Sequence, residues 1–416
     1  MLNVLNLKTL GKLVHPLHRA LVSGVQQTIG ANGVQLTEDG VNDNGREILH
    51  IETRQMCRCE ACYGRHSHQK LLMTLGNGVK VTEIMEVSEN YISMKWSDGH
   101  KGQMPRTMTG AYGPPNTTSV LETYYDVTMR KNSAQVFWTV QGEDNFKAFD
   151  YDEVIKSDEN TKEFLAHYMK YGIGFLRGIP DEEDIMKFNN IDLKIGNPRV
   201  TVFDPVDMVK FKPNADNFAY SSDELPGHTD LPYYNDSSSA QFFICLKNTV
   251  EGGESFWIDT FAAMKEVRDE RPELFEILAK VPIFFKNDPP GIEINLYSSV
   301  PVVELNGNDI RRVRDHIGSS DEYQFMVSTD IETRKLWWDA FTYYKSKVED
   351  DSRKIRHSMR AGDLVMTDNW RVLHGRKSFF VTAPTQERNV ATWYIDWNHL
   401  QNRMLSVSNG FLDLKS

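Results

Sequence analysis

Residues 227–230 read Gly227-His228-Thr229-Asp230, and Trp370-Arg371-Val372-Leu373-His374-Gly375-Arg376 follows far along the chain. On an extended strand, His-x-Asp places an imidazole and a carboxylate on one face, because side chains alternate between the two faces. A histidine from a distant strand would complete the two-histidine, one-carboxylate facial triad, which holds Fe(II) and leaves coordination positions open. We therefore predict that His228, Asp230 and His374 form a metal site around which the main domain folds.

The segments around this site predict a mainly β, α+β domain. Apolar runs at 241–246, 363–367 and 390–395 are typical of strands. Helical patterns occur at 157–171, from 260, from 272 and at 331–348, with Ser157 and Thr260 as N-caps, Pro272 as a first helical residue, and Leu336, Ala340, Phe341, Tyr344 and Val348 on one face. Short strands with helices inserted between them indicate a double-stranded β-helix, the double-sheet jelly roll.

A small β-rich module is expected ahead of this domain, where cysteines lie close together. Cys57, Cys59 and Cys62 offer three thiolates within a few residues, which suits Zn²⁺ with four tetrahedral ligands. Three histidines are candidates for the fourth ligand: His66, His68 and His100. We expect a structural zinc site, because a closed four-ligand site has no position open for a substrate.

The overall composition limits the partners. The chain has 416 residues and a formal net charge of −11, which argues against nucleic acid as a partner. No apolar run approaches membrane-spanning length. We expect an N-terminal extension (1–30), a zinc-binding domain (31–110), a connecting region (111–150), a jelly-roll domain (151–405) and a C-terminal tail (406–416).

The first residues allow two interpretations. From Met1 to Thr37 there is no Asp or Glu, and leucines recur at helical spacing. This pattern is typical of a mitochondrial transit peptide, although such peptides usually carry more Arg and Ser; it also fits an ordinary surface helix. We expect an intracellular protein and favour mitochondria over the cytoplasm.

The combined motifs resemble those of the Fe(II)- and 2-oxoglutarate-dependent dioxygenases of the taurine-dioxygenase-like group. They are His228-Thr229-Asp230-Leu231-Pro232, Gly252-Gly253-Glu254-Ser255, Asp368-Asn369-Trp370-Arg371-Val372-Leu373-His374-Gly375-Arg376 and the later Arg388. More narrowly, the chain is similar to γ-butyrobetaine hydroxylase and trimethyllysine hydroxylase, whose zinc domain the cysteine cluster and Trp96-Ser97-Asp98-Gly99-His100 resemble.

This resemblance implies roles for single residues. Iron would be held by His228, Asp230 and His374, and His100 would be the fourth zinc ligand. The far carboxylate of 2-oxoglutarate would pair with Arg388, helped by the hydroxyl of Ser255. O₂ would be the co-substrate, ascorbate the reductant, and a homodimer the assembly.

The resemblance also implies a small trimethylammonium amino acid as substrate, first γ-butyrobetaine, which would be hydroxylated to L-carnitine, and second trimethyllysine. Tyr220, Tyr394 and Phe203 match aromatic positions of a cation cage, and Asn217 matches a position at the substrate's carboxylate end. Asp207 stands where a tryptophan is expected; it would either pair with the cation directly or mark a different substrate.

Three other interpretations compete with this one. A dioxygenase with a different substrate keeps every metal ligand. An inactive relative acting as a binding protein would not need an open facial triad. A zinc hydrolase using His228, Asp230 and His374 would give no role to Arg388 or to the glycine turn before Ser255.

Overall fold

The computed structural model describes residues 33–62, 78–106, 131–142, 144–179, 195–212, 218–288 and 293–407. The chain divides into two compact units, residues 1–113 and 114–416. Residues 1–32 and 408–416 lie outside the described residues, as do His66, His68 and Asn217. The structure therefore does not test the expected N-terminal extension.

The first unit consists of two three-stranded antiparallel sheets and a short helix. The strands of one sheet are β1 (Val34–Leu36), β2 (Gly40–Asp43) and β3 (Arg46–Leu49), and those of the other are β4 (Val81–Val87), β5 (Tyr91–Trp96) and β6 (Lys101–Pro105). Helix α1 (His50–Gln55) follows β3 directly. Val41, Ile92, Met94, Trp96 and Met104 form a small core that includes Cys57 and Cys62.

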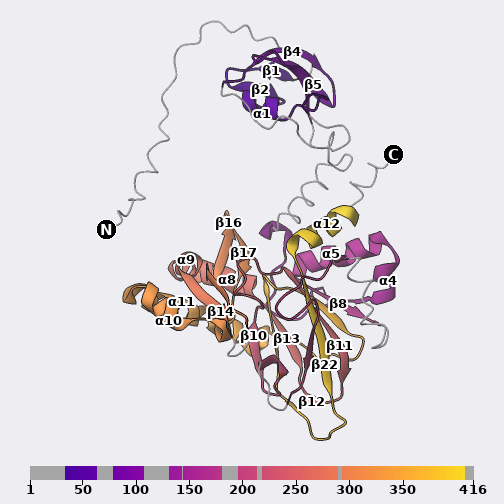
Figure 1. Cartoon of the computed structure of the whole chain (residues 1–416), viewed down its shortest axis with the longest axis vertical. Coiled ribbons are helices and arrows are strands. Elements are labelled where there is room, and N and C mark those ends of the chain that lie inside the picture. Colours follow the sequence, from indigo (N-terminus) through magenta and orange to yellow (C-terminus); the bar gives the residue numbers. More distant parts are fainter. Residues whose placement is uncertain are drawn as a thin grey trace. The chain divides into compact units, whose positions relative to one another are not determined.

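The second unit is built on two larger sheets (Figure 1). The six-stranded sheet has the order β7 (Ala148–Asp150), β8 (Ile173–Arg177), β19 (Leu364–Asp368), β11 (Ala240–Asn248), β22 (Arg388–Ile395), β9 (Asp207–Lys210). The four-stranded sheet has the order β10 (Leu225–His228), β20 (Val372–Arg376), β13 (Ser255–Asp259), β18 (Ile355–His357). Strands distant in sequence are thus neighbours in both sheets, and the predicted jelly roll is confirmed.

Smaller elements connect these sheets. Three two-stranded pairs are β12 (Glu251–Gly252) with β21 (Phe379–Phe380), β14 (Pro282–Asn287) with β15 (Leu296–Pro301), and β16 (Val303–Asn306) with β17 (Asp309–Val313). The short 3₁₀ turns are η2 (Asn132–Ala134), η3 (Phe218–Tyr220), η4 (Ile317–Ser319) and η5 (Asp351–Arg353).

Helices cover the outer faces of both sheets (Figure 1). Helices α4 (Tyr151–Lys156), α5 (Asp158–Tyr171) and α12 (Trp397–Val407) share a core with the six-stranded sheet. Helices α8 (Thr260–Glu270), α9 (Pro272–Lys280), α10 (Glu322–Ser328) and α11 (Ile331–Val348) share a core with Phe256 and Ile258 of β13. A third cluster, which includes Phe175, Trp257 and Val365, joins residues of the two sheets.

Alternation along the strands decides which side chains face the interior. In β22 the outer side chains Ala391, Trp393 and Ile395 pack with α5 and α12, so the even-numbered ones point between the sheets. The same rule turns His374 and Arg376 of β20 inward. Polar groups at regular spacing thus reach one interior cavity.

The predicted helix boundaries agree with the structure except at one cap. Ser157 accepts from the backbone N–H of Asn160 and caps α5, which ends at Gly172 in the left-handed conformation (φ 73°). Pro272 opens α9, and α11 covers 331–348 as expected. The N-cap of α8 is Asp259, whose carboxylate accepts two backbone N–H groups, so the expectation of Thr260 was wrong by one residue.

Within the described part of the chain, every helix is too short or too polar to cross a membrane.

Candidate metal centres and active site

Strand pairing brings the two predicted histidine ligands together. In the register of β10 against β20, His228 lies directly opposite His374, and the two imidazole centroids are 4.3 Å apart. Both residues are more than nine-tenths buried: His228 is 9% exposed and His374 is 7% exposed. His228 Nδ1 lies 2.8 Å from the carbonyl oxygen of Pro226, which fixes that nitrogen as the donor and leaves Nε2 for a metal.

Asp230 lies beside the two histidines, but the backbone conformation that places it there differs from the predicted extended strand. The strand ends at His228, so His228 and Asp230 do not lie on one face of a regular strand. Thr229 instead pairs with the backbone of Asp315, and the N–H of Asp230 donates to the side chain of Asn369 at 2.8 Å. Leu231 then adopts a left-handed conformation (φ 59°). This local turn, rather than strand alternation, aims the carboxylate at the histidines.

The distances fit a common metal ion. Asp230 Oδ1 lies 3.3 Å from His228 Nε2, and Asp230 Oδ2 lies 3.5 Å from His374 Nε2. Adjacent ligands of an octahedral ion, each at about 2.1 Å, would lie ~3.0 Å apart. Both histidine nitrogens thus lie close to the Asp230 carboxylate, each beside a different oxygen of it.

Hydrogen bonds hold the Asp230 carboxylate in place. Its Oδ2 accepts from Gln241 Nε2 and from the hydroxyl of Tyr394, each at 2.7 Å. Burial alone would raise the pKa of Asp230, but His374 and His228 hold it well below its usual value. The carboxylate is therefore ionised and oriented before a metal arrives.

The triad lines a cavity of about 440 Å³ that also contains two buried arginines. Arg388, 7% exposed, donates from Nη2 to the hydroxyl of Ser255 at 3.4 Å, and its Nε has no hydrogen-bond partner. Among the described residues no carboxylate forms an ion pair with Arg388, and burial lowers its pKa. A buried guanidinium without an anion is costly, so this end of the cavity is suited to a carboxylate ligand.

Arg376 is the second arginine; both of its terminal nitrogens already have acceptors, and its Nε has none. It donates to the backbone carbonyls of Ala219, Ser221 and Asp223 at 3.0, 2.8 and 2.7 Å. Burial and the nearby Arg388 lower the pKa of Arg376 to about 10. Arg376 therefore fastens the η3 segment to β20, and Arg388 is the cation left for a ligand.

The expected substrate residues take different positions. Phe203, Asp207 and Tyr394 line the cavity, whereas Tyr220 is not part of its wall. The hydroxyl of Tyr220 donates to both oxygens of Asp207, at 3.0 and 3.1 Å, and the ammonium of Lys212 lies 4.1 Å from the centroid of its ring. Asn217 lies outside the described residues.

His316 is a residue at the site that the sequence did not indicate. Its Nδ1 lies 3.1 Å from the carbonyl oxygen of Thr229, and its ring centroid is 4.7 Å from that of His228. The ligand atoms of His228, Asp230 and His316 all lie within 4.8 Å of one another. Burial and the neighbouring His228 lower the pKa of His316 to about 3, so the imidazole is neutral. Asp315-His316 follows β17 without any spacing motif, which is why no sequence pattern indicated it.

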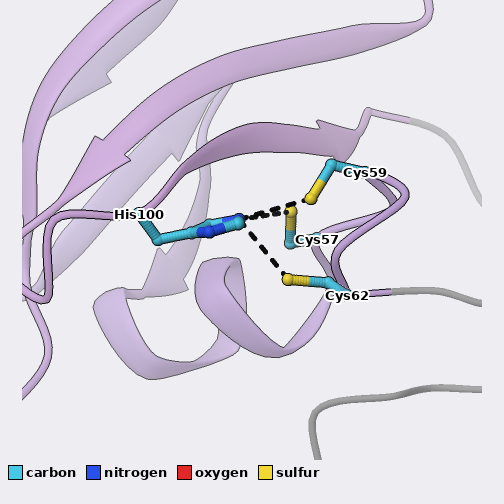
Figure 2. A group of neighbouring side chains, drawn as sticks. All are labelled: Cys57, Cys59, Cys62 and His100. Carbon is cyan, nitrogen blue, oxygen red and sulfur yellow. Dashed lines mark hydrogen bonds between the residues drawn. The ribbon is translucent and has the colours of Figure 1, made fainter.

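The cysteine cluster of the first unit forms a second, separate ligand set (Figure 2). His100 Nε2 lies 3.5, 3.4 and 3.4 Å from the Sγ atoms of Cys57, Cys59 and Cys62. One imidazole nitrogen cannot donate a proton to three sulfurs. With Zn–S of ~2.3 Å and Zn–N of ~2.0–2.1 Å, tetrahedral ligands would lie about 3.5–3.6 Å apart, so the set fits one zinc ion.

The surroundings of this cluster support the same interpretation. A Cβ atom on Gly102 would lie 2.4 Å from Cys57 Sγ and 2.8 Å from His100 Nε2, so only glycine leaves room for the ligands. Arg54 donates to Cys62 Sγ at 3.0 Å and to Asp98 at 2.9 Å. Burial raises the pKa of the Cys57 thiol to about 12, a cost that a bound cation would remove.

The amino-acid sequence matches two family models. Residues 136–393 match the model of the taurine catabolism dioxygenase TauD, TfdA family. Residues 41–104 match the model described as gamma-butyrobetaine hydroxylase-like, N-terminal. The two matches fall on the jelly-roll unit and on the unit with the cysteine cluster, respectively.

Several characterised proteins are similar to the chain. Dioxygenase str8 of Strobilurus tenacellus is 26% identical over 338 residues, 78% of this chain and 75% of that protein. The mitochondrial trimethyllysine dioxygenase of Mus musculus is 23% identical over 347 residues, 79% and 76% of the two chains. The gamma-butyrobetaine dioxygenase of Homo sapiens is 26% identical over 258 residues, 61% and 65%.

Among solved structures, the non-heme iron oxygenase OrfP in complex with Fe and alpha-ketoglutaric acid is similar with a TM-score of 0.44 and 14% identity. The likeness covers 68% of this chain and 94% of that one.

Proposed function

Because the chain belongs to the taurine catabolism dioxygenase TauD, TfdA family, we propose that it uses Fe(II), 2-oxoglutarate and O₂ to hydroxylate a small organic cation. The resemblance expected from the motifs is confirmed by the family models, and the chain is a dioxygenase of this family. The identity of its substrate is a separate matter, because relatives named for different substrates are about equally similar to it.

The observation that carries the proposal is the buried Arg388 in the same cavity as the triad. Its guanidinium has the hydroxyl of Ser255 as a neighbour and no carboxylate partner among the described residues. A dicarboxylate such as 2-oxoglutarate would pair one carboxylate with Arg388 and reach the metal with its keto-acid end. This use of Arg388 would be pointless in a zinc hydrolase.

His228, Asp230 and His374 would hold the iron. Bound iron supplies the O₂ chemistry, in which 2-oxoglutarate is oxidised to succinate and CO₂ and a C–H bond of the substrate becomes C–OH. The protein's own groups have simpler tasks. Gln241 and Tyr394 fix the Asp230 carboxylate, and Pro226 fixes the tautomer of His228. The walls of the cavity, including Phe243 and Trp257, limit access of water.

The substrate proposal rests on charge within the cavity and on the relatives. Asp207 adds a carboxylate to the wall, beside Phe203 and Tyr394. Relatives are named for trimethyllysine and gamma-butyrobetaine, both of which carry a cationic nitrogen on a flexible carbon chain. γ-Butyrobetaine, converted to L-carnitine, and trimethyllysine are therefore the two reference compounds, tested in that order.

Further parts of the proposal concern the whole protein. We infer that Cys57, Cys59, Cys62 and His100 hold a structural zinc ion and that residues 31–110 form a separate zinc domain ahead of the jelly-roll domain. Ascorbate as reductant, a homodimer and a mitochondrial location stay predictions. The names of the trimethyllysine relatives support the location.

The test measures succinate formation by the purified full chain with Fe(II), 2-oxoglutarate, ascorbate and O₂, with each reference compound and without either. Replacing Arg388 by Ala should raise the KM for 2-oxoglutarate by about 100-fold, since a buried ion pair loses one partner at a cost of roughly 3 kcal/mol or more. Metal affinity should be unchanged. Arg311→Ala, at an exposed arginine, is the matched control. An unchanged KM in the Arg388 variant would contradict the proposal.

A further inference from the structure

We propose that the cation bound in this cavity carries at least one N–H bond, so that the enzyme prefers a primary, secondary or tertiary ammonium, or a guanidinium, to a quaternary ammonium. This inference rests on the proposed function and refines its substrate class. The residue that decides it is Asp207.

Asp207 is a carboxylate in the cavity wall with hydrogen-bonding capacity left over. It lies on the edge strand β9, opposite Thr392 of β22, and so faces the same interior as Arg388 and Tyr394. Tyr220 supplies one hydroxyl donor to its two oxygens. The backbone N–H of Met208 also donates to this carboxylate. An ionised carboxylate has about four acceptor sites, so Asp207 can still accept from water or a ligand N–H. Asp207 is half-buried, and this burial raises its pKa.

Among the described residues, Asp207 forms no ion pair with a lysine, arginine or histidine. The nearest cation acting on it is Lys212, whose ammonium lies over the ring of Tyr220 at 4.1 Å from the centroid. Arg388 and Arg376 belong to the part of the cavity near Ser255, and Asp230 would be neutralised by the metal. A bound cation is therefore the natural partner of Asp207.

One of the three aromatic residues expected to form a cage for a quaternary ammonium lies outside the cavity wall. Tyr220 is not part of the cavity wall, and it contacts Asp207 through its hydroxyl and Lys212 through its ring. Tyr394 is in the wall, but its hydroxyl donates to Asp230 at 2.7 Å. The described wall holds the rings of Phe203, Tyr233, Phe243, Trp257 and Tyr394, but it also holds Asp207, to which a quaternary ammonium cannot donate a hydrogen bond.

Energies favour the same choice of ligand. A cation–π contact is available to methylated and unmethylated cations alike. A charge-assisted hydrogen bond to Asp207 adds to it, and a quaternary ammonium cannot form one. A quaternary ligand would also leave acceptor sites of Asp207 unpaired in a partly buried place. A preference of about tenfold or more for N–H-bearing cations follows.

The experiment uses two series in which charge and chain length are constant and only the number of N–H bonds changes. One series is 4-aminobutyrate, 4-(methylamino)butyrate, 4-(dimethylamino)butyrate and γ-butyrobetaine. The other is lysine with zero to three methyl groups on its side-chain nitrogen. Binding to the full chain is measured by calorimetry with Mn(II) in place of Fe(II) and with 2-oxoglutarate present, so that no turnover occurs.

The wild-type chain should bind the best N–H-bearing member of at least one series at least about tenfold more tightly than the trimethyl member. Asp207→Asn, which keeps the side-chain shape, should reduce that ratio to near one by weakening the N–H-bearing ligands most. Asp339→Asn, at an exposed aspartate of α11 outside the cavity wall, is the matched control and should keep the wild-type ratio. Thermal unfolding of each variant separates a binding effect from loss of the fold.

Equal or tighter binding of both trimethyl members by the wild-type chain would overturn the inference. So would a preference that persists unchanged in Asp207→Asn, or the failure of every member of both series to bind. Succinate formation without substrate is measured in parallel with Fe(II). Its absence would count against the proposed dioxygenase itself, whereas its presence with a failed preference would overturn only the role given to Asp207.

Discussion

The two candidate metal centres of this chain are built in opposite ways. Three ligands of the cysteine cluster lie within six residues, and His100 completes a closed set around one point. The triad combines the neighbouring His228 and Asp230 with the distant His374, and it opens onto a cavity. The first arrangement suits holding a small unit together, and the second suits presenting a metal to other molecules.

The two sites depend on different features of the surrounding fold. The cluster needs local geometry and a missing side chain at Gly102. The triad needs the register of β10 against β20, the turn at Leu231 and the amide of Asn369. Loss of a ligand at the closed site should therefore destabilise the unit that contains it. Loss of a ligand at the open site should instead reduce catalytic activity.

The largest effect is expected at the triad. His374→Ala should lower substrate-dependent succinate formation at least about a thousandfold, roughly 4 kcal/mol of activation free energy, because it removes one of the three proposed iron ligands. The midpoint of thermal unfolding of the first unit should not change. Activity assays and calorimetric melting on one preparation check both statements. Activity within tenfold of wild type would remove His374 from the ligand set.

The second-largest effect is expected at the cysteine cluster, where stability rather than activity should change. Cys59→Ser should lower the stability of the first unit strongly, because zinc binding supplies much of the folding free energy of small metal domains. The surviving folded fraction should keep its kcat. Zinc content measured by mass spectrometry is the decisive readout. Stoichiometric zinc in this variant would show that the ligand set is wrong.

A smaller effect is expected at Arg54, which contacts one of the proposed zinc ligands. Arg54 donates to Cys62 Sγ, so Arg54→Ala should weaken zinc affinity by about tenfold or more without abolishing binding. Competition with a chelator measures this affinity. Arg58→Ala, at the residue that follows Cys57, is a matched control outside the ligand set. Equal affinities in wild type and in Arg54→Ala would assign the Arg54 contact to packing alone.

The last prediction is a pH dependence of zinc uptake. Burial raises the pKa of Cys57 to about 12, so without metal this thiol is protonated at neutral pH and must lose its proton to bind zinc. Zinc affinity should therefore rise with pH between 6 and 8, by about tenfold per unit for each proton released. Calorimetry in two buffers of different ionisation enthalpy counts the protons. A count of zero would contradict a buried, protonated Cys57.

Much of this architecture could be predicted from residue patterns. The strands around 241–246, 363–367 and 390–395 follow from apolar runs, and α11 follows from its helical repeat. Even there, the face of α11 was partly wrong: Leu336 is 39% exposed, and Trp337 takes the buried place. Neighbouring positions on a helix differ by about 100°, so either can face the core until the packing partners are known.

The parts of the site that escaped prediction depend on contacts between distant segments. His316 reaches the triad because residues 315–316 bond to Thr229 in three places, a pairing that no spacing in the sequence reveals. Tyr220 was expected to line an aromatic cage for the substrate cation, but its hydroxyl donates a hydrogen bond to Asp207. Metal ligands can be recognised by residue type, whereas the partners of an aromatic ring are decided by packing.

The most direct test of the central claim is to run the reaction under ¹⁸O₂ and to analyse succinate by mass spectrometry. An iron- and 2-oxoglutarate-dependent dioxygenase with this triad and Arg388 should place one ¹⁸O atom in each succinate formed, and a second in any hydroxylated cation. Succinate absent, with label entering products only from H₂¹⁸O, would contradict the account and favour hydrolytic chemistry at the same three ligands.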